Sequence, residues 1–151
     1  MFANNPTLCA YAEARKIPFA EVLKNHQKAN NPVANDMIII SVGTGLESKS
    51  YSFKKLQKAG KIGWVNPIID ILMSSNAETV DYQISQMFQT LGQRNQKNYY
   101  RLNPSLKNAA PAMDNVKGSN IENLIQAGLS YIDDNRETLN QIVQKLIRNK
   151  I

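Results

Sequence analysis

The chain has 151 residues, of which 42% are hydrophobic and 20% charged, a composition that fits one ordinary globular domain with a core of its own. Its net charge is +6, but the basic residues are scattered and the aromatic residues do not interleave with them, which excludes a nucleic-acid-binding pattern. A solvated basic surface is favoured over an anionic partner such as a phospholipid surface. One cysteine excludes an intrachain disulfide, and no stretch approaches the roughly 20 apolar residues that span a bilayer.

The N-terminal residues predict a helix over 6–16. Asn5 is a good N-cap, and Pro6 suits the first helical position, where its missing N–H costs nothing. Pro18 disfavours helix in the residue before it and ends the segment. Cys9 lies on a mostly apolar stretch of this helix, which favours a buried, inert thiol over a nucleophile.

The next segment leads to the clearest strand. Residues 19–29 predict a short helix or an irregular excursion, and the Asn-Asn-Pro run at 30–32 predicts a turn. Residues 37–42 predict a strand, and the continuous apolar run at 37–40 is typical of one buried on both faces of a parallel sheet. The Gly-Thr-Gly run at 43–45 predicts a tight turn that allows close approach of a neighbouring segment.

Helices dominate the rest of the chain. Residues 53–59 predict one helical turn or more, and the strongest helix begins after Pro67, with a possible break at 74–76. Its apolar stripe has three- and four-residue spacing and comprises Ile69, Leu72, Met73, Ala77, Val80, Ile84, Met87, Phe88 and Leu91. A loop over 105–118 precedes two amphipathic helices, marked by Ile121, Leu124, Ile125, Leu129 and Ile132, and by Leu139, Ile142, Val143, Leu146 and Ile147.

The strand inventory is too small for a free-standing sheet. Residues 97–102 predict a second strand, half polar and therefore at an edge, which Pro104 ends. Two strands do not make a stable sheet by themselves. The sequence therefore argues for missing sheet partners, and we expect the isolated chain to be helical with exposed apolar surface.

No self-sufficient active site is present in the sequence, so we assign no catalytic, cofactor-binding or metal-binding residue and expect no cofactor. The single histidine, His26, lies in a polar run and predicts a surface residue. No Gly-x-Ser-x-Gly elbow occurs, and Ser41 lacks the preceding glycine. Asp36 and the pair Asp133-Asp134 are explained by helix-cap and surface roles.

Trp64 has two interpretations. Indoles favour lipid–water interfaces, and Ile62, Val65, Ile68 and Ile69 are nearby, which would suit contact with lipid. A tryptophan buried in a helix junction is the favoured interpretation.

Several runs resemble the patatin-like acyl hydrolases. They are Phe2-Ala3-Asn4-Asn5-Pro6, Glu13-Ala14, and Ile38 through Gly45. Later residues also resemble the family and follow its motif order. They are Tyr82, Phe88, Gln89 and Leu91 in the long helix, Asn98 through Leu102, Met113-Asp114, and Asn120 through Gly128.

The resemblance implies the C-terminal part of a three-layer α/β/α fold, predominantly helical in this fragment with few strands. It divides residues 1–151 into three parts: 1–45 with a helix, an excursion and a core strand; 46–104 with a loop, long helices and an edge strand; and 105–151 with a loop and C-terminal helices. The implied activity is hydrolysis of acyl esters of phospholipids by a Ser-Asp dyad, with membrane phospholipid as substrate. In the family the Asn-Asn-Pro run follows the catalytic Asp, which would lie three residues before Met1.

These implications give two alternatives. In the first, the chain is the C-terminal portion of a patatin-like hydrolase, inactive alone because its serine, oxyanion loop and Asp lie upstream in a missing N-terminal half. Asn4, Asn5 and Pro6 would support the Asp rather than act chemically. In the second, it is a non-catalytic remnant or interaction module that binds anionic lipid or a partner chain. With no signal peptide or transmembrane segment in this chain, a cytoplasmic location is expected, although a longer precursor could differ.

Overall fold

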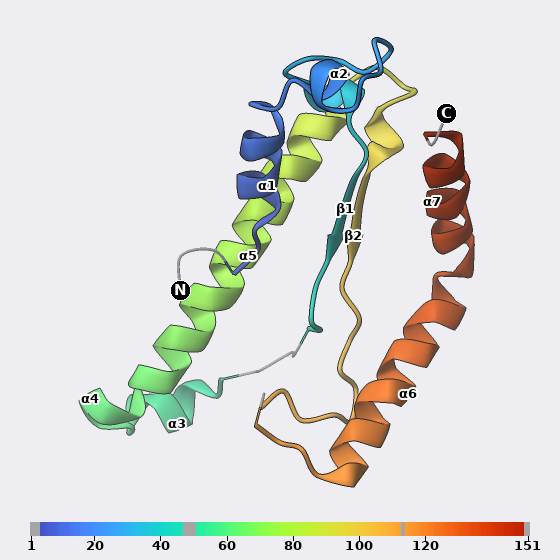
Figure 1. Cartoon of the computed structure of the whole chain (residues 1–151). Helices are drawn as coiled ribbons and strands as arrows, with labels where there is room; N and C mark the ends of the chain where they lie inside the picture. The colour runs from blue at the N-terminus through green and yellow to red at the C-terminus, as the bar shows by residue number, and fades with distance from the viewer. Residues whose placement is uncertain (1–3, 47–50, 113, 150–151) are drawn as a thin grey trace. The chain divides into compact units, whose positions relative to one another are not determined.

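The computed structural model describes residues 4–46, 51–112 and 114–149 (Figure 1). Its described residues divide into two compact units, one of residues 4–42 and 51–102 and one of residues 43–46, 103–112 and 114–149. The first unit contains α1 (Thr7–Ala14), α2 (Phe19–Val22), β1 (Ile39–Val42), α3 (Phe53–Gln57), α4 (Gly60–Gly63), α5 (Val65–Gln89) and β2 (Tyr99–Leu102). The second contains α6 (Gly118–Asp134) and α7 (Arg136–Arg148).

The two predicted strands pair in parallel. Ile39 of β1 lies opposite Tyr99 of β2, and the register continues to Val42 opposite Leu102. Both strands begin two residues later than predicted, because single 3₁₀ turns, Ala34–Asp36 and Gln96–Asn98, precede them. Among the described residues the sheet has two strands, and the isoleucines of β1 are therefore half-buried rather than covered on both faces.

The core of the first unit lies between α5 and the sheet. Ile84 and Phe88, one helical turn apart on α5, are each only 1% exposed and pack with Ala34. The Phe88 ring meets the Tyr99 ring of β2 with centroids 6.0 Å apart. The C-terminal half of the predicted apolar stripe is thus the part that is buried.

Helix α5 is continuous, so the possible break at 74–76 does not occur. The Ser74 hydroxyl donates to the carbonyl oxygen of Asp70 at 2.7 Å, which satisfies the side chain within the helix. The helix also starts two residues before Pro67, because proline is tolerated in a first turn whose N–H groups have no helical partner.

Helix α1 lies along α5 (Figure 1), and it corrects the prediction for Cys9. Thr7, Tyr11 and Ala14, at four- and three-residue spacing, are the less exposed positions of α1. Cys9 falls between them on the other face and is exposed. The prediction of a buried thiol is wrong, because an apolar stretch of sequence does not by itself say which face of a short helix is covered.

The excursion after α1 forms one helical turn, α2, followed by turns. The predicted turn at 30–32 is confirmed. The backbone of Asn31 is left-handed with φ of 54°, and its side chain donates to the carbonyl oxygen of Arg15 at 3.1 Å. The Asn30 side chain accepts a hydrogen bond from the N–H of Ala20 at 3.0 Å and holds α2 against the turn.

Trp64, between α4 and α5, is 38% exposed, so the favoured prediction of a buried indole is wrong. Trp64 lies at the junction of α4 and α5, which contact each other, and that contact leaves part of the indole exposed. Val65 and Leu72 of α5 are 51% and 64% exposed.

In the second unit, the segment after β1 approaches the segment after β2. The N–H of Leu46 donates to Pro104 at 2.7 Å, and the N–H of Leu106 donates back to Leu46 at 3.1 Å. Gly45 has φ of +119°, and a Cβ there would lie 2.3 Å from Cδ2 of Leu106. Close approach of a neighbouring segment was predicted for the glycines at 43–45, and it is confirmed at Gly45.

Substitution Gly45→Ala is therefore expected to destabilise this pairing by about 1–3 kcal/mol, since the new methyl group overlaps Leu106 and the backbone angle disfavours a side chain. Native-state hydrogen exchange at the amides of Leu46 and Leu106 measures the effect as faster exchange. Gly128→Ala in α6 is the control, because no atom lies within 4 Å of its Cβ position and helix propensity favours alanine. Unchanged exchange in the Gly45 variant would contradict the argument.

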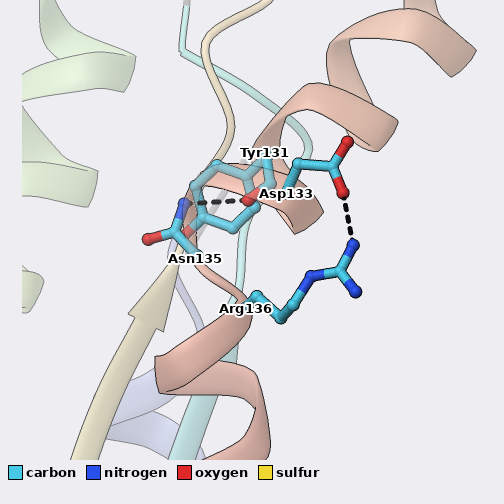
Figure 2. A network of polar contacts seen from close by, with 4 residues as sticks. All are labelled: Tyr131, Asp133, Asn135 and Arg136. Atoms are coloured by element: carbon cyan, nitrogen blue, oxygen red, sulfur yellow. Dashed lines mark hydrogen bonds and ion pairs between the residues drawn. The ribbon is translucent and has the colours of Figure 1, made fainter.

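Helices α6 and α7 confirm the two predicted C-terminal helices and meet at Asn135 (Figure 2). The Asn135 side chain and N–H donate to the carbonyl oxygen of Tyr131 at 2.9 and 3.0 Å, which satisfies the end of α6. Arg136 and Asp133 form an ion pair at 2.8 Å with both side chains largely exposed. The surface role predicted for Asp133 is confirmed, and such a pair contributes little to stability.

Candidate functional site

A chain of buried polar groups joins the N-terminal segment to the sheet. Asn5, 1% exposed, accepts at its Oδ1 from the hydroxyl of Thr7 at 2.6 Å and from the Thr7 N–H at 3.2 Å. The Thr7 hydroxyl lies 2.6 Å from the hydroxyl of Ser41 on β1. Arg101 of β2 donates from Nη1 to the same Ser41 oxygen at 2.7 Å. These four side chains are called the polar junction below.

The residues at the two ends of the polar junction, Asn5 and Arg101, determine which group is the donor in each of its hydrogen bonds. The Asn5 amide nitrogen donates to the carbonyl oxygen of Ala77 at 3.2 Å, so the other amide atom, facing Thr7, is the acceptor oxygen. Thr7 must then donate to Asn5 and accept from Ser41. Ser41 gives its proton to Thr7 and accepts from the Arg101 guanidinium, so every donor points from Arg101 toward Asn5.

Local structure places each member of the polar junction. Ser41 and Arg101 are opposite each other in the parallel register. Thr7 is the first residue of α1, which begins one residue later than predicted, so Pro6 and not Asn5 is the N-cap residue. The Asn5 side chain still accepts a hydrogen bond from the Thr7 N–H. The segment is further attached to α5, where Asn4 donates to the carbonyl oxygen of Met73 at 3.0 Å, one turn from Ala77.

A second polar contact joins α5 to the sheet. The Tyr99 hydroxyl of β2 donates to the Asp81 carboxylate of α5. Burial raises the pKa of Tyr99 well above its ordinary value, and the hydrogen bond and negative charge of Asp81 raise it further. Tyr99 is therefore a protonated donor at neutral pH.

The polar junction positions backbone rather than performing chemistry. An activated serine needs a general base that accepts its proton. The proton of Ser41 goes to a threonine hydroxyl, and its lone pair faces a guanidinium, which cannot accept a proton. No general base contacts Ser41 in the polar junction, and the network holds residues 5 and 7 against β1 and β2.

The remaining residues considered from sequence lie apart from the polar junction. His26 is exposed, as predicted. Asp36 accepts from the N–H of Val33 at 3.0 Å, which confirms its helix-cap role. Within residues 4–46, 51–112 and 114–149, no group of three or more His, Cys, Asp or Glu side chains could hold a metal ion. In the same ranges no helix is both long and apolar enough to cross a membrane.

Sequence reasoning missed the roles of Thr7, Ser41 and Arg101. One signal was available, because Ser41 interrupts an apolar run that otherwise predicts a buried strand, and a buried hydroxyl requires a partner. Nothing in the sequence indicated that the partners would be Thr7 and Arg101, which lie 34 and 60 positions away.

The chain matches no protein-family model. It is 36% identical over 142 residues to "Patatin-like protein 3" of Arabidopsis thaliana, an alignment that covers 83% of this chain and 31% of that protein. "Patatin-like protein 2" of Oryza sativa subsp. indica is 30% identical over 142 residues, covering 88% of this chain and 35% of that protein. The chain belongs to the patatin-like family. "Probable inactive patatin-3-Kuras 1" of Solanum tuberosum is 30% identical over 111 residues, covering 68% of this chain and 29% of that protein.

The patatin-like chain spans about a third of the length of these relatives. The resemblance found in the sequence is thereby confirmed at the level of the family. Its residues Asn4, Asn5 and Pro6, which carried the resemblance, lie in or beside the polar junction.

Proposed function

We propose that this chain is the C-terminal portion of a patatin-like lipid acyl hydrolase and follows the catalytic Asp of that domain. The observation that supports this most strongly is the burial of Asn5 with hydrogen bonds to both Thr7 and Ala77. A buried amide that is hydrogen-bonded at both its oxygen and its nitrogen fixes the backbone that leads into α1. In this proposal the anchored segment would help to place the Asp that precedes the Asn-Asn-Pro run in the family.

In this proposal the polar junction acts as a positioning element. A catalytic base must lie within hydrogen-bonding reach of the group it deprotonates, and small displacements reduce the rate strongly. Asn5 and Asn4 would anchor the segment to α5, and Thr7 would anchor it to β1. The nucleophilic serine and the oxyanion loop would come from the part of the domain that supplies the other layers of the three-layer fold.

Exposed apolar side chains support a larger domain around the chain. Val42 at the end of β1 is 72% exposed, and α6 and α7 each expose several large apolar residues. The exposed apolar residues of these two helices are Ile121, Leu124, Ile125, Leu129, Ile132, Val143, Leu146 and Ile147. Contiguous exposed apolar surface is typical of faces that contact something else.

The chain alone is expected to be inactive, because the polar junction contains no base that could activate Ser41. The measurement is hydrolysis of a short-chain p-nitrophenyl ester by the purified chain and by its Ser41→Ala variant. Both should match the rate of buffer. Activity of the chain that the Ser41→Ala substitution abolishes would overturn the proposal.

Translation of the DNA upstream of Met1 tests the same proposal independently. An in-frame Asp-Gly-Gly immediately upstream and a Gly-x-Ser-x-Gly further upstream would support a hydrolase, and the longer product should then hydrolyse the ester. An immediate stop codon or frameshift would instead favour the second candidate, a non-catalytic patatin-like remnant. The similarity to a relative named "Probable inactive patatin-3-Kuras 1" favours keeping that candidate.

A further inference from the structure

An exposed apolar surface lies at the N-terminal end of α5, where α4 precedes it (Figure 1). Val65, Ile68, Ile69 and Leu72 have helical one-face spacing and are 46–64% exposed. Ile62 in α4 is 90% exposed. Together with Trp64 these residues form a surface that we call the α4–α5 apolar surface.

Basic residues outnumber acidic ones around this surface. Residues 51–69 contain four lysines and no aspartate or glutamate. Lys54 of α3, Lys61 of α4 and Lys58 between these helices are exposed, and α3 contacts α4. The nearest acidic residue along α5, Asp70, accepts a hydrogen bond from the Tyr51 hydroxyl at 2.5 Å.

The exposed apolar faces of α6 and α7 differ in this respect. Helix α6 contains Glu122, Asp133 and Asp134 and no lysine or arginine, and α7 contains Glu137 together with basic residues. The acidic residues of these helices would be repelled by an anionic lipid surface, whereas lysines are attracted to it. Exposed isoleucine and leucine beside several lysines, with a tryptophan at the edge, are typical of a segment that lies in a lipid–water interface.

We propose that the α4–α5 apolar surface docks on the surface of an anionic lipid bilayer. The lysines would contact anionic head groups while the apolar side chains and the Trp64 indole enter the head-group boundary. This inference deepens the proposed function by naming the face through which the hydrolase would approach its substrate, and it rests on that function. Vesicle binding is measured without hydrolysis, so a chain that fails to bind vesicles leaves the proposed hydrolase function testable, and the reverse also holds.

Trp64 is the single tryptophan of the chain and reports on this surface directly. The purified chain is mixed with vesicles of phosphatidylcholine and phosphatidylglycerol, or of phosphatidylcholine alone, at low salt. With anionic vesicles, Trp64 emission should shift to the blue, and phosphatidylcholine brominated on its acyl chains should quench it. The shift should weaken as salt is added, because head-group attraction is screened within a Debye length.

Charge variants separate this surface from the rest of the chain. The triple variant Lys54→Gln, Lys58→Gln and Lys61→Gln should bind anionic vesicles roughly a hundredfold more weakly, given the usual attraction of each lysine near such a membrane. The control triple variant Arg94→Gln, Lys117→Gln and Arg148→Gln removes the same charge from exposed positions elsewhere and should bind as the parent does.

Two results would overturn the proposal. Vesicle binding without quenching of Trp64, or equal loss in both triple variants, would place the contact on another part of the chain. Emission that is already blue and shielded from iodide without vesicles would mean that a second copy of the chain, or another protein segment, covers the surface.

Discussion

Substitution Phe88→Ala is expected to destabilise the first unit by about 3–5 kcal/mol, the largest effect we predict for one residue. Phe88 is 1% exposed, packs with Ile84 and Ala34, and meets the Tyr99 ring at 6.0 Å. Truncation removes these contacts and leaves a cavity between α5 and β2. The hydrogen bond from Tyr99 to Asp81 would remain, so the contact between α5 and β2 would lose its apolar packing and keep this polar interaction.

Native-state hydrogen exchange by mass spectrometry measures this loss without assuming that the whole chain unfolds in one step. Peptides from α5 and β2 should lose at least about a hundredfold of their protection, since each 1.4 kcal/mol corresponds to about tenfold. Tyr82→Ala is the matched control, an aromatic residue of the same helix that is 66% exposed. A loss of similar size in the control would show that the effect does not arise from the core.

Substitution Asn5→Ala is expected to cost about 2–3 kcal/mol of local stability in α1. It removes the acceptor of the Thr7 hydroxyl and N–H and the donor to Ala77. The buried Thr7 hydroxyl then loses the oxygen to which it donates, so the hydrogen-bond network that begins at Arg101 lacks its final acceptor. Asn5→Asp should not restore stability, because it replaces a donor to Ala77 by a buried negative charge.

Exchange of the α1 amides measures the effect, and faster exchange by roughly thirtyfold or more is expected. Asn4→Ala is the control, since Asn4 is exposed and makes one hydrogen bond, to Met73, so a change within about 0.5 kcal/mol is expected. If Asn5→Ala exchanges like Asn4→Ala, the polar junction does not fix the N-terminal segment, and the support it gives to the proposed function is lost.

Local sequence signals predicted the elements well where one rule dominated. The spacing of Ile84, Met87 and Phe88 predicts the helix and its buried end, because apolar residues three and four positions apart lie on one face only in an α-helix. Asn31 before a proline predicts the turn, since asparagine tolerates the left-handed backbone. Strand starts were less accurate, because an apolar or aromatic run shows where a strand is favoured but not where pairing with its neighbour begins.

Prediction failed where exposure depended on which neighbour is present. Cys9 and Trp64 both lie in apolar surroundings in the sequence, and both are exposed. Apolar neighbours in the sequence do not show that another helix or strand covers a residue in the folded chain. For Trp64 the error is informative, because the exposed indole marks the surface that we propose to dock on lipid.

The sequence by itself determined the family, the order of the main helices, and the two strands, because those depend on motif order and on hydrophobic period. The tertiary structure alone decided that β1 and β2 pair in parallel with Ser41 opposite Arg101, and that Thr7 and Asn5 complete the hydrogen-bond chain. The reason is physical. A serine in a buried strand indicates that its hydroxyl needs a hydrogen-bond partner, but the sequence does not say which residue that is. Thr7 and Arg101, 34 and 60 positions away, become partners of Ser41 only when the folded backbone brings them within hydrogen-bonding distance.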